Sequence, residues 1–171
     1  MTTQQIILLG SAYLIELVAV AYFTRATALR IVGALGGAVA AGLFAMGAIA
    51  VGEAFGWWRV SLASTLYFLP LIYLGLSSLT PIYLVTWRLV RRFGGRGLAA
   101  FIGIVTIIGP PRDYLVAAKY PHWMVFAPGI APILADAAIY AALVFMGHAA
   151  MRLIAGPVHA DRLTRQSIKA A

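Results

Sequence analysis

Residues that could do chemistry gather beside a double proline in the second half of this sequence. Residues 109–114 have the sequence Gly-Pro-Pro-Arg-Asp-Tyr and lie in an otherwise apolar stretch. Two adjacent prolines remove two backbone donors and disfavour continuation of the preceding helix. A charge pair beside such an interruption needs polar groups to meet it when the surroundings are lipid. The pattern therefore places a candidate polar site at Arg112 and Asp113.

A second acidic residue belongs to the same candidate site. Asp136 is spaced by four from Pro132 and from Tyr140, so the three share a helical face. Counted from Ala127, Asp136 lies about 13 Å along its helix, which is inside the hydrocarbon layer. A charge at that depth costs about 3 kcal/mol, so we expect Asp136 to be protonated or paired. The expected partners are Arg112 and Lys119.

Glu16 is the other acid expected inside the membrane, since it interrupts the first apolar run. It shares a face with Tyr13 and has no cation at its depth. We expect it to be protonated or hydrogen-bonded to a hydroxyl such as Ser77, Thr80 or a tyrosine.

Two hypotheses explain these groups together. The first is an outward-opening pocket for an amphipathic or anionic ligand, with a polar head at the charges and a tail against aromatic rings. The second is a structural ion-pair network joining the helices. The expected ligand-binding residues of the pocket are Arg112, Asp113, Asp136, Lys119, His122, Glu53, Arg59, Trp57, Trp58, Tyr114, Trp123 and Tyr140.

Residue composition argues against several kinds of bound group. There is no cysteine, which excludes disulfides and thiolate metal sites. The three histidines, at 122, 148 and 159, are too far apart for a shared metal or haem, and His148 is expected to be a hydrogen-bonded helix residue. We predict no cofactor and no metal.

The chain as a whole is too apolar for a soluble domain. Of its 171 residues 63% are hydrophobic and 11% are charged, against about 25% charged in ordinary globular proteins. Five segments can each span a bilayer of about 30 Å: 5–24, 31–53, 61–87, 97–118 and 126–154. The sequence predicts an all-α integral membrane protein, a compact bundle of five transmembrane helices in one domain (1–156) with a short basic tail (157–171).

Cation positions predict the orientation. The net charge is +8, and 11 of the 13 cations are arginine. Grouped by alternate loops, ten cations fall on one side and three on the other, which predicts an outside N-terminus and a cytoplasmic C-terminus. The expected membrane is a bacterial inner membrane. The basic side is expected to meet anionic lipid headgroups, and nucleic acid is not an expected partner. Since the N-terminus lacks a basic region, we expect no cleaved signal peptide.

Two further patterns concern packing. Gly33, Gly37 and Ala41 recur every four residues, which lets helix backbones approach closely. This face either packs within the bundle or forms a homo-oligomer or a contact with a partner subunit. The fourth segment reaches Gly109 after about 13 residues, or about 20 Å, so we expect its helix to be kinked or broken at Pro110-Pro111.

Three functions compete on this sequence. The first is ligand binding or solute handling, with proton coupling through Glu16 and Asp136 as a variant. The second is an accessory subunit of a larger membrane assembly. The third is a membrane enzyme acting on a lipid or isoprenoid, with Asp113, Asp136 and His122 as acid and base.

Overall fold

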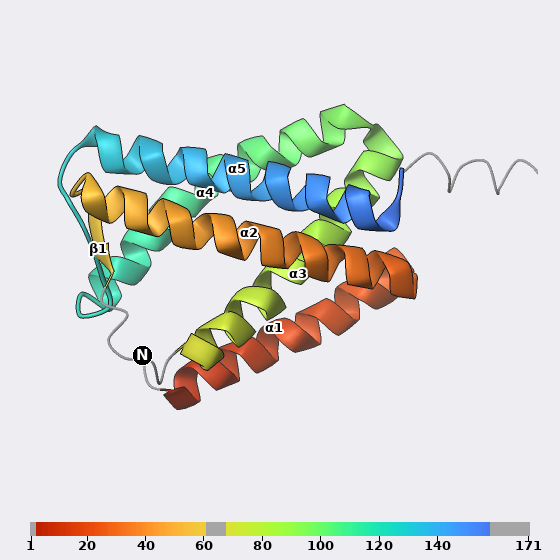
Figure 1. Ribbon diagram of the computed structural model, residues 1–171, viewed down its shortest axis with the longest axis horizontal. Helices are drawn as coiled ribbons and strands as arrows, with labels where there is room; N and C mark the ends of the chain where they lie inside the picture. The colour runs from red at the N-terminus through yellow and green to blue at the C-terminus, as the bar shows by residue number, and fades with distance from the viewer. Residues whose placement is uncertain (1–2, 61–67, 158–171) are drawn as a thin grey trace, which may run out of the picture.

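A computed structural model describes residues 3–60 and 68–157 of the protein. The described part contains five helices and two short strands (Figure 1). In chain order these are α1 (Thr3–Thr24), α2 (Ala28–Ala54), β1 (Trp58–Val60), α3 (Phe68–Phe93), α4 (Gly95–Lys119), β2 (Met124–Phe126) and α5 (Ile130–Ala155).

Four of the helices are long and apolar enough to cross a membrane: α1, α2, α4 and α5. The chain therefore has the character of a helical membrane protein. α3, which covers most of the expected third span (61–87), is not one of the four. Its last two turns carry Arg88, Arg91 and Arg92. Residues 61–67 of that segment and the basic tail beyond 157 lie outside the described residues.

The core lies where α2, α3 and α5 meet. The small-residue face of α2 is buried through Gly33, Gly37 and Ala41. A Cβ added at Gly37 would meet the carbonyl of Gly147 on α5 and the ring of Tyr83 on α3. Within the described residues this face of α2 packs against α3 and α5, and an association with a second copy or a partner subunit stays a prediction.

Hydroxyl groups within this core bond to helix carbonyls. The Tyr83 hydroxyl donates to the Leu143 carbonyl oxygen at 3.0 Å, and the Thr80 hydroxyl donates to that of Leu76 at 2.6 Å. Thr80 precedes Pro81, which lacks the donor that a helix would use at that position. The hydroxyls of α3 therefore satisfy carbonyl groups of helix backbone.

The double proline does not break the fourth helix. α4 continues from Gly95 to Lys119 with Pro110 and Pro111 inside it, and Figure 1 shows that its course is not straight. At 25 residues it is about 37 Å long, which is enough for a hydrocarbon layer of about 30 Å. Of the two alternatives, kinked or broken, the structure has a helix that runs on.

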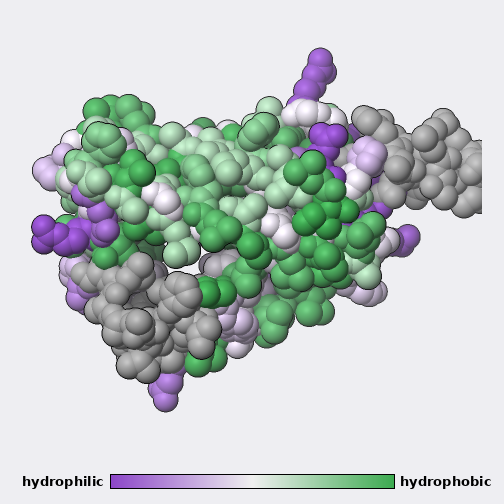
Figure 2. All heavy atoms as spheres, in the orientation of Figure 1, coloured by the Kyte–Doolittle hydropathy of each residue, from purple (hydrophilic) through white to green (hydrophobic). Residues whose placement is uncertain are grey.

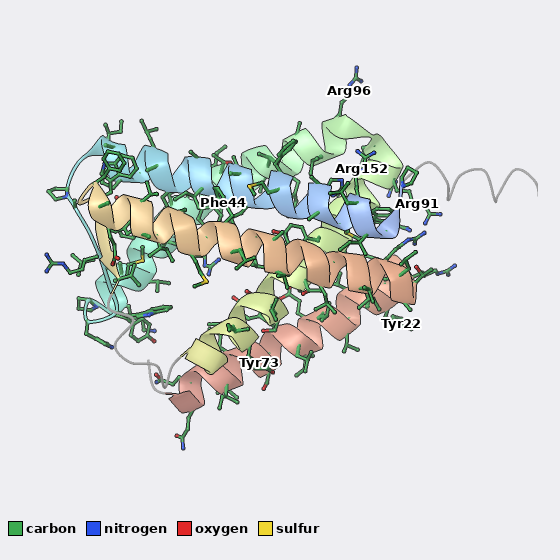
Figure 3. All side chains as sticks on the ribbon, in the orientation of Figure 1. Tyr22, Phe44, Tyr73, Arg91, Arg96 and Arg152 are labelled. Carbon is green, nitrogen blue, oxygen red and sulfur yellow. The ribbon has the colours of Figure 1, made fainter. Side chains whose placement is uncertain are left out.

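The two ends of the bundle differ. The α1–α2 and α3–α4 connections lie at one end, where α5 also finishes (Figure 1). Arginines occur at this end on several helices, and Figure 3 shows Arg91, Arg96 and Arg152 there. At the opposite end β1 pairs with β2 in antiparallel register, Trp58 opposite Phe126. Which end faces the cytoplasm stays a prediction.

Substitution of Gly37 by Ala tests the close approach of α2 to its neighbours. The added methyl group would overlap backbone of α5, so we expect a loss of about 1–3 kcal/mol in unfolding free energy. Gly42 on the same helix is the control, because a Cβ there meets nothing. Gly42→Ala should be neutral or stabilise by up to about 1 kcal/mol. Unfolding in mixed micelles measures both, and equal effects would contradict this packing.

Candidate functional site

The contact between α4 and α5 begins at a glycine. A Cβ added at Gly109 would overlap the ring of Tyr140, so the absence of a side chain there lets that ring lie against α4. Asp113 follows Gly109 by four residues and is therefore on the same face of α4. This is why the Tyr140 hydroxyl can donate to Asp113 Oδ2, at 2.8 Å.

Arg112 and Asp113 form a loose ion pair on α4. Arg112 Nε lies 3.9 Å from Asp113 Oδ1, and the two side chains are 62% and 26% exposed. Arg112 also interacts electrostatically with Tyr13 of α1 and with Asp136 of α5. Arg112 thus interacts with both acids of the candidate site, Asp113 and Asp136.

Asp136 is the most buried member of this group. Its side chain is 7% exposed, and it interacts electrostatically with Asp113 and Arg112. Asp113 is six residues before the last residue of α4 and Asp136 is six after the first residue of α5. Both carboxylates therefore lie about 9 Å from the same end of the bundle.

Two buried polar atoms of this group have no hydrogen-bond partner among the described residues. They are Asp136 Oδ2 and the hydroxyl oxygen of Tyr114, and the two residues also interact electrostatically. Buried polar groups in proteins are nearly always satisfied, and an unmet one costs about 1–3 kcal/mol. A ligand or water that bonds to both would remove that cost.

Aromatic rings continue from Tyr114 toward the paired strands. Tyr114 stacks on Phe126 with ring centroids 4.1 Å apart, and Phe126 meets Trp58 edge to face at 6.0 Å. Trp58 is buried beside Gly52, and its Nε1 donates to the Ile49 carbonyl at 3.1 Å. The strand pairing of β1 and β2 is what brings Trp58 opposite Phe126.

The remaining expected ligand-binding residues belong to the helix ends and connecting segments at this end of the bundle. Glu53 accepts a bond from the Val60 amide at 2.8 Å, and Arg59 is exposed on β1. Lys119 lies over the ring of Tyr120, 5.6 Å from its centroid, and His122 meets the same ring edge to face. Arg112, rather than Lys119, interacts with Asp136.

The two other tryptophans of the predicted pocket are half-buried. Trp57 stacks on Phe55 with ring centroids 4.9 Å apart. The Trp123 amide donates to the Tyr120 carbonyl at 2.9 Å. Both belong to connecting segments between helices, where membrane proteins often place tryptophan at the lipid interface.

Glu16 does not join the candidate site. It is exposed on α1, and the hydroxyls expected to meet it, Ser77 and Thr80, donate to carbonyls of their own helix instead. His148 is hydrogen-bonded as expected, with Nδ1 3.0 Å from the Thr86 hydroxyl. Within the described residues no group of three or more His, Asp or Glu side chains is placed to hold a metal ion.

Sequence reasoning did not include Phe126 or Tyr13 in the site. Phe126 lies ten residues before Asp136 and carries no polar group, so no motif marks it. The sequence places Tyr13 on the same helix face as Glu16 and does not relate it to Arg112. Phe126 enters the site by stacking on Tyr114, and Tyr13 through its electrostatic interaction with Arg112, and periodicity within one helix shows neither relation.

Comparisons with protein-family models, with curated proteins and with solved structures found no match. The fold and the site define the class of protein: a helical membrane protein with an acid pair and an arginine between two of its apolar helices.

A double-mutant cycle on Tyr140→Phe and Asp113→Asn tests the bond between α4 and α5. A hydrogen bond to a charged group contributes about 1.5–3 kcal/mol, so the coupling energy should approach that range. The control cycle combines Tyr140→Phe with Glu16→Gln, which should be additive within about 0.5 kcal/mol. Mixed-micelle unfolding gives all values. A coupling near zero for the first cycle would contradict the bond.

Proposed function

We propose that this protein binds an amphipathic small molecule between α4 and α5, with a polar head that donates hydrogen bonds to Asp136. The observation that supports this most is the unsatisfied Asp136 Oδ2 beside the unsatisfied Tyr114 hydroxyl. Both can accept a hydrogen bond, and they belong to α4 and α5, two helices that are apolar enough to cross a membrane.

The charge of the group favours a cationic head over an anionic one. Two carboxylates, Asp113 and Asp136, share one arginine, so the ionised group carries a net charge of −1. Arg112 already interacts with both acids, and its side chain is the most exposed of the three. A bound amine or other donor would balance the charge, whereas a carboxylate head would increase the repulsion.

The aromatic rings give this ligand an apolar side. Tyr114 joins the polar group to the Phe126 and Trp58 rings, so one residue borders both environments. Aromatic side chains bury large apolar areas and commonly line ligand sites together with a few placed polar groups. An alkyl tail of the ligand would extend along these rings.

The arrangement lends less support to a lipid-modifying enzyme. That hypothesis needs His122 near the two acids, but His122 is exposed and meets the Tyr120 ring edge to face in the α4–α5 connection. Asp113 also accepts a hydrogen bond from the Tyr140 hydroxyl. This bond fits a role for Asp113 in positioning α4 against α5.

Matched probes with one tail and three heads test the proposal. The full chain in phosphatidylcholine nanodiscs is exposed to dodecylamine, dodecanol or dodecanoate, and binding is read from the thermal unfolding midpoint and by native mass spectrometry. Dodecylamine should bind best. Asp136→Asn should weaken its binding about tenfold or more, equivalent to at least about 1.4 kcal/mol. Tyr114→Phe should weaken it by a smaller factor.

Glu16→Gln is the matched control, because it makes the same acid-to-amide change at an exposed residue of α1. Its dodecylamine binding should equal that of the unmodified protein. An equal loss in both variants would show general electrostatic attraction, and tighter binding of dodecanoate would contradict the assigned head group. If no probe binds and Asp136→Asn simply raises stability, the group is a structural network.

A further inference from the structure

A second polar region lies at the opposite end of the bundle, between the α1–α2 turn and the end of α3. It is a small depression on the surface of the bundle. Its lining comes from three helices and one turn: Thr24, Ala26, Arg30, Leu84, Trp87, Arg88 and Arg91. We call these seven residues the arginine depression. It lies at the level of the helix ends, since Thr24 is the last residue of α1.

Three like charges converge on the arginine depression. Arg30 lies in the first turn of α2, while Arg88 and Arg91 are three apart near the end of α3 and so share a face. Arg30 is close enough to both to be repelled by them. As far as the described residues go, no acidic side chain belongs to the lining. Anions are attracted to such a concentration of guanidinium groups, which bind phosphate in a bidentate way.

The tryptophan of the depression adds an independent feature. Trp87 is 4% exposed, and its Nε1 has no hydrogen-bond partner among the described residues. The Arg30 guanidinium lies over its ring, 5.7 Å from the centroid, so the ring holds that cation in place. Indole Nε1 can only donate a hydrogen bond. Like the arginines, Trp87 Nε1 would therefore be satisfied by an acceptor such as a phosphate oxygen.

The surroundings favour a lipid over a free anion. Tyr22 and Phe23, which precede Thr24 on α1, are each 77% exposed. An acyl chain could lie along these apolar side chains while its phosphate meets the arginines. Free phosphate would gain nothing from them.

We propose that the arginine depression is a binding site for the phosphate headgroup of an anionic lipid, held by Arg30, Arg88 and Arg91 with Trp87. This site is separate from the Asp136 group and is independent of the function proposed for it. It also differs from a general attraction of basic ends to membranes, because it assigns the binding to particular arginines.

Lipid titration of the full chain in phosphatidylcholine nanodiscs tests the assignment. The probes are phosphatidic acid at low mole fraction and inorganic phosphate, with retention read by native mass spectrometry and the thermal midpoint as a second readout. Phosphatidic acid should bind, and Arg88→Gln with Arg91→Gln should weaken it about tenfold or more. Inorganic phosphate should show much weaker binding.

The control pair is Arg92→Gln with Arg96→Gln, which removes the same charge from the same end. Both residues are exposed and outside the depression, and Figure 3 shows Arg96 extending away from the bundle. Binding should then change less than about twofold. Equal losses in the two pairs would overturn the proposal in favour of a diffuse field, and equal affinity for inorganic phosphate would overturn the lipid assignment.

Trp87→Phe provides a second variant should the double substitution fail to insert. It keeps the ring and removes the Nε1 donor, so phosphatidic acid should bind several-fold more weakly while the helix content by circular dichroism stays the same. If Trp87→Phe and the pair Arg88→Gln with Arg91→Gln both bind phosphatidic acid as tightly as the unmodified protein, the proposed site is wrong.

Discussion

The burial of one carboxylate between apolar helices is the constraint on which the structure most depends. Asp136 is nearly inaccessible to solvent. The face of the molecule that Figure 2 shows is largely hydrophobic. A lone ionised acid in such surroundings would be very costly. The arrangement that limits this cost draws Arg112 toward the same level and ties Asp113 to Tyr140. The site and the α4–α5 contact are therefore one structural feature.

Small residues make that arrangement possible. Gly109 lets the Tyr140 ring lie on α4, and Gly37 and Gly147 let α2 and α5 approach around Tyr83. In lipid there is little hydrophobic force between helices, so close backbone contact and interhelical hydrogen bonds must hold them together. The same glycines that permit tight packing thus determine where the polar side chains meet.

The two ends of the bundle have opposite electrostatic character. Near the paired strands two acids outnumber their arginine, and at the other end three arginines converge beside a tryptophan. The two ends therefore suit different ligands. The Asp136 group suits a hydrogen-bond donor, and the arginine depression suits an acceptor. Each carries a buried polar atom without a described partner, Asp136 Oδ2 and Trp87 Nε1.

By itself the sequence determined the membrane class and the helical segments, because length and hydropathy are properties of local stretches. It also identified Arg112, Asp113, Asp136 and Tyr140 as a group, since a buried acid needs a partner and residues spaced by four share a face. Tertiary structure decided that α4 continues through its two prolines and that Phe126 stacks on Tyr114. It also decided that Glu16 is not part of the candidate site. These outcomes depend on which helices touch, and contacts between segments distant in sequence leave no periodic signal in either one.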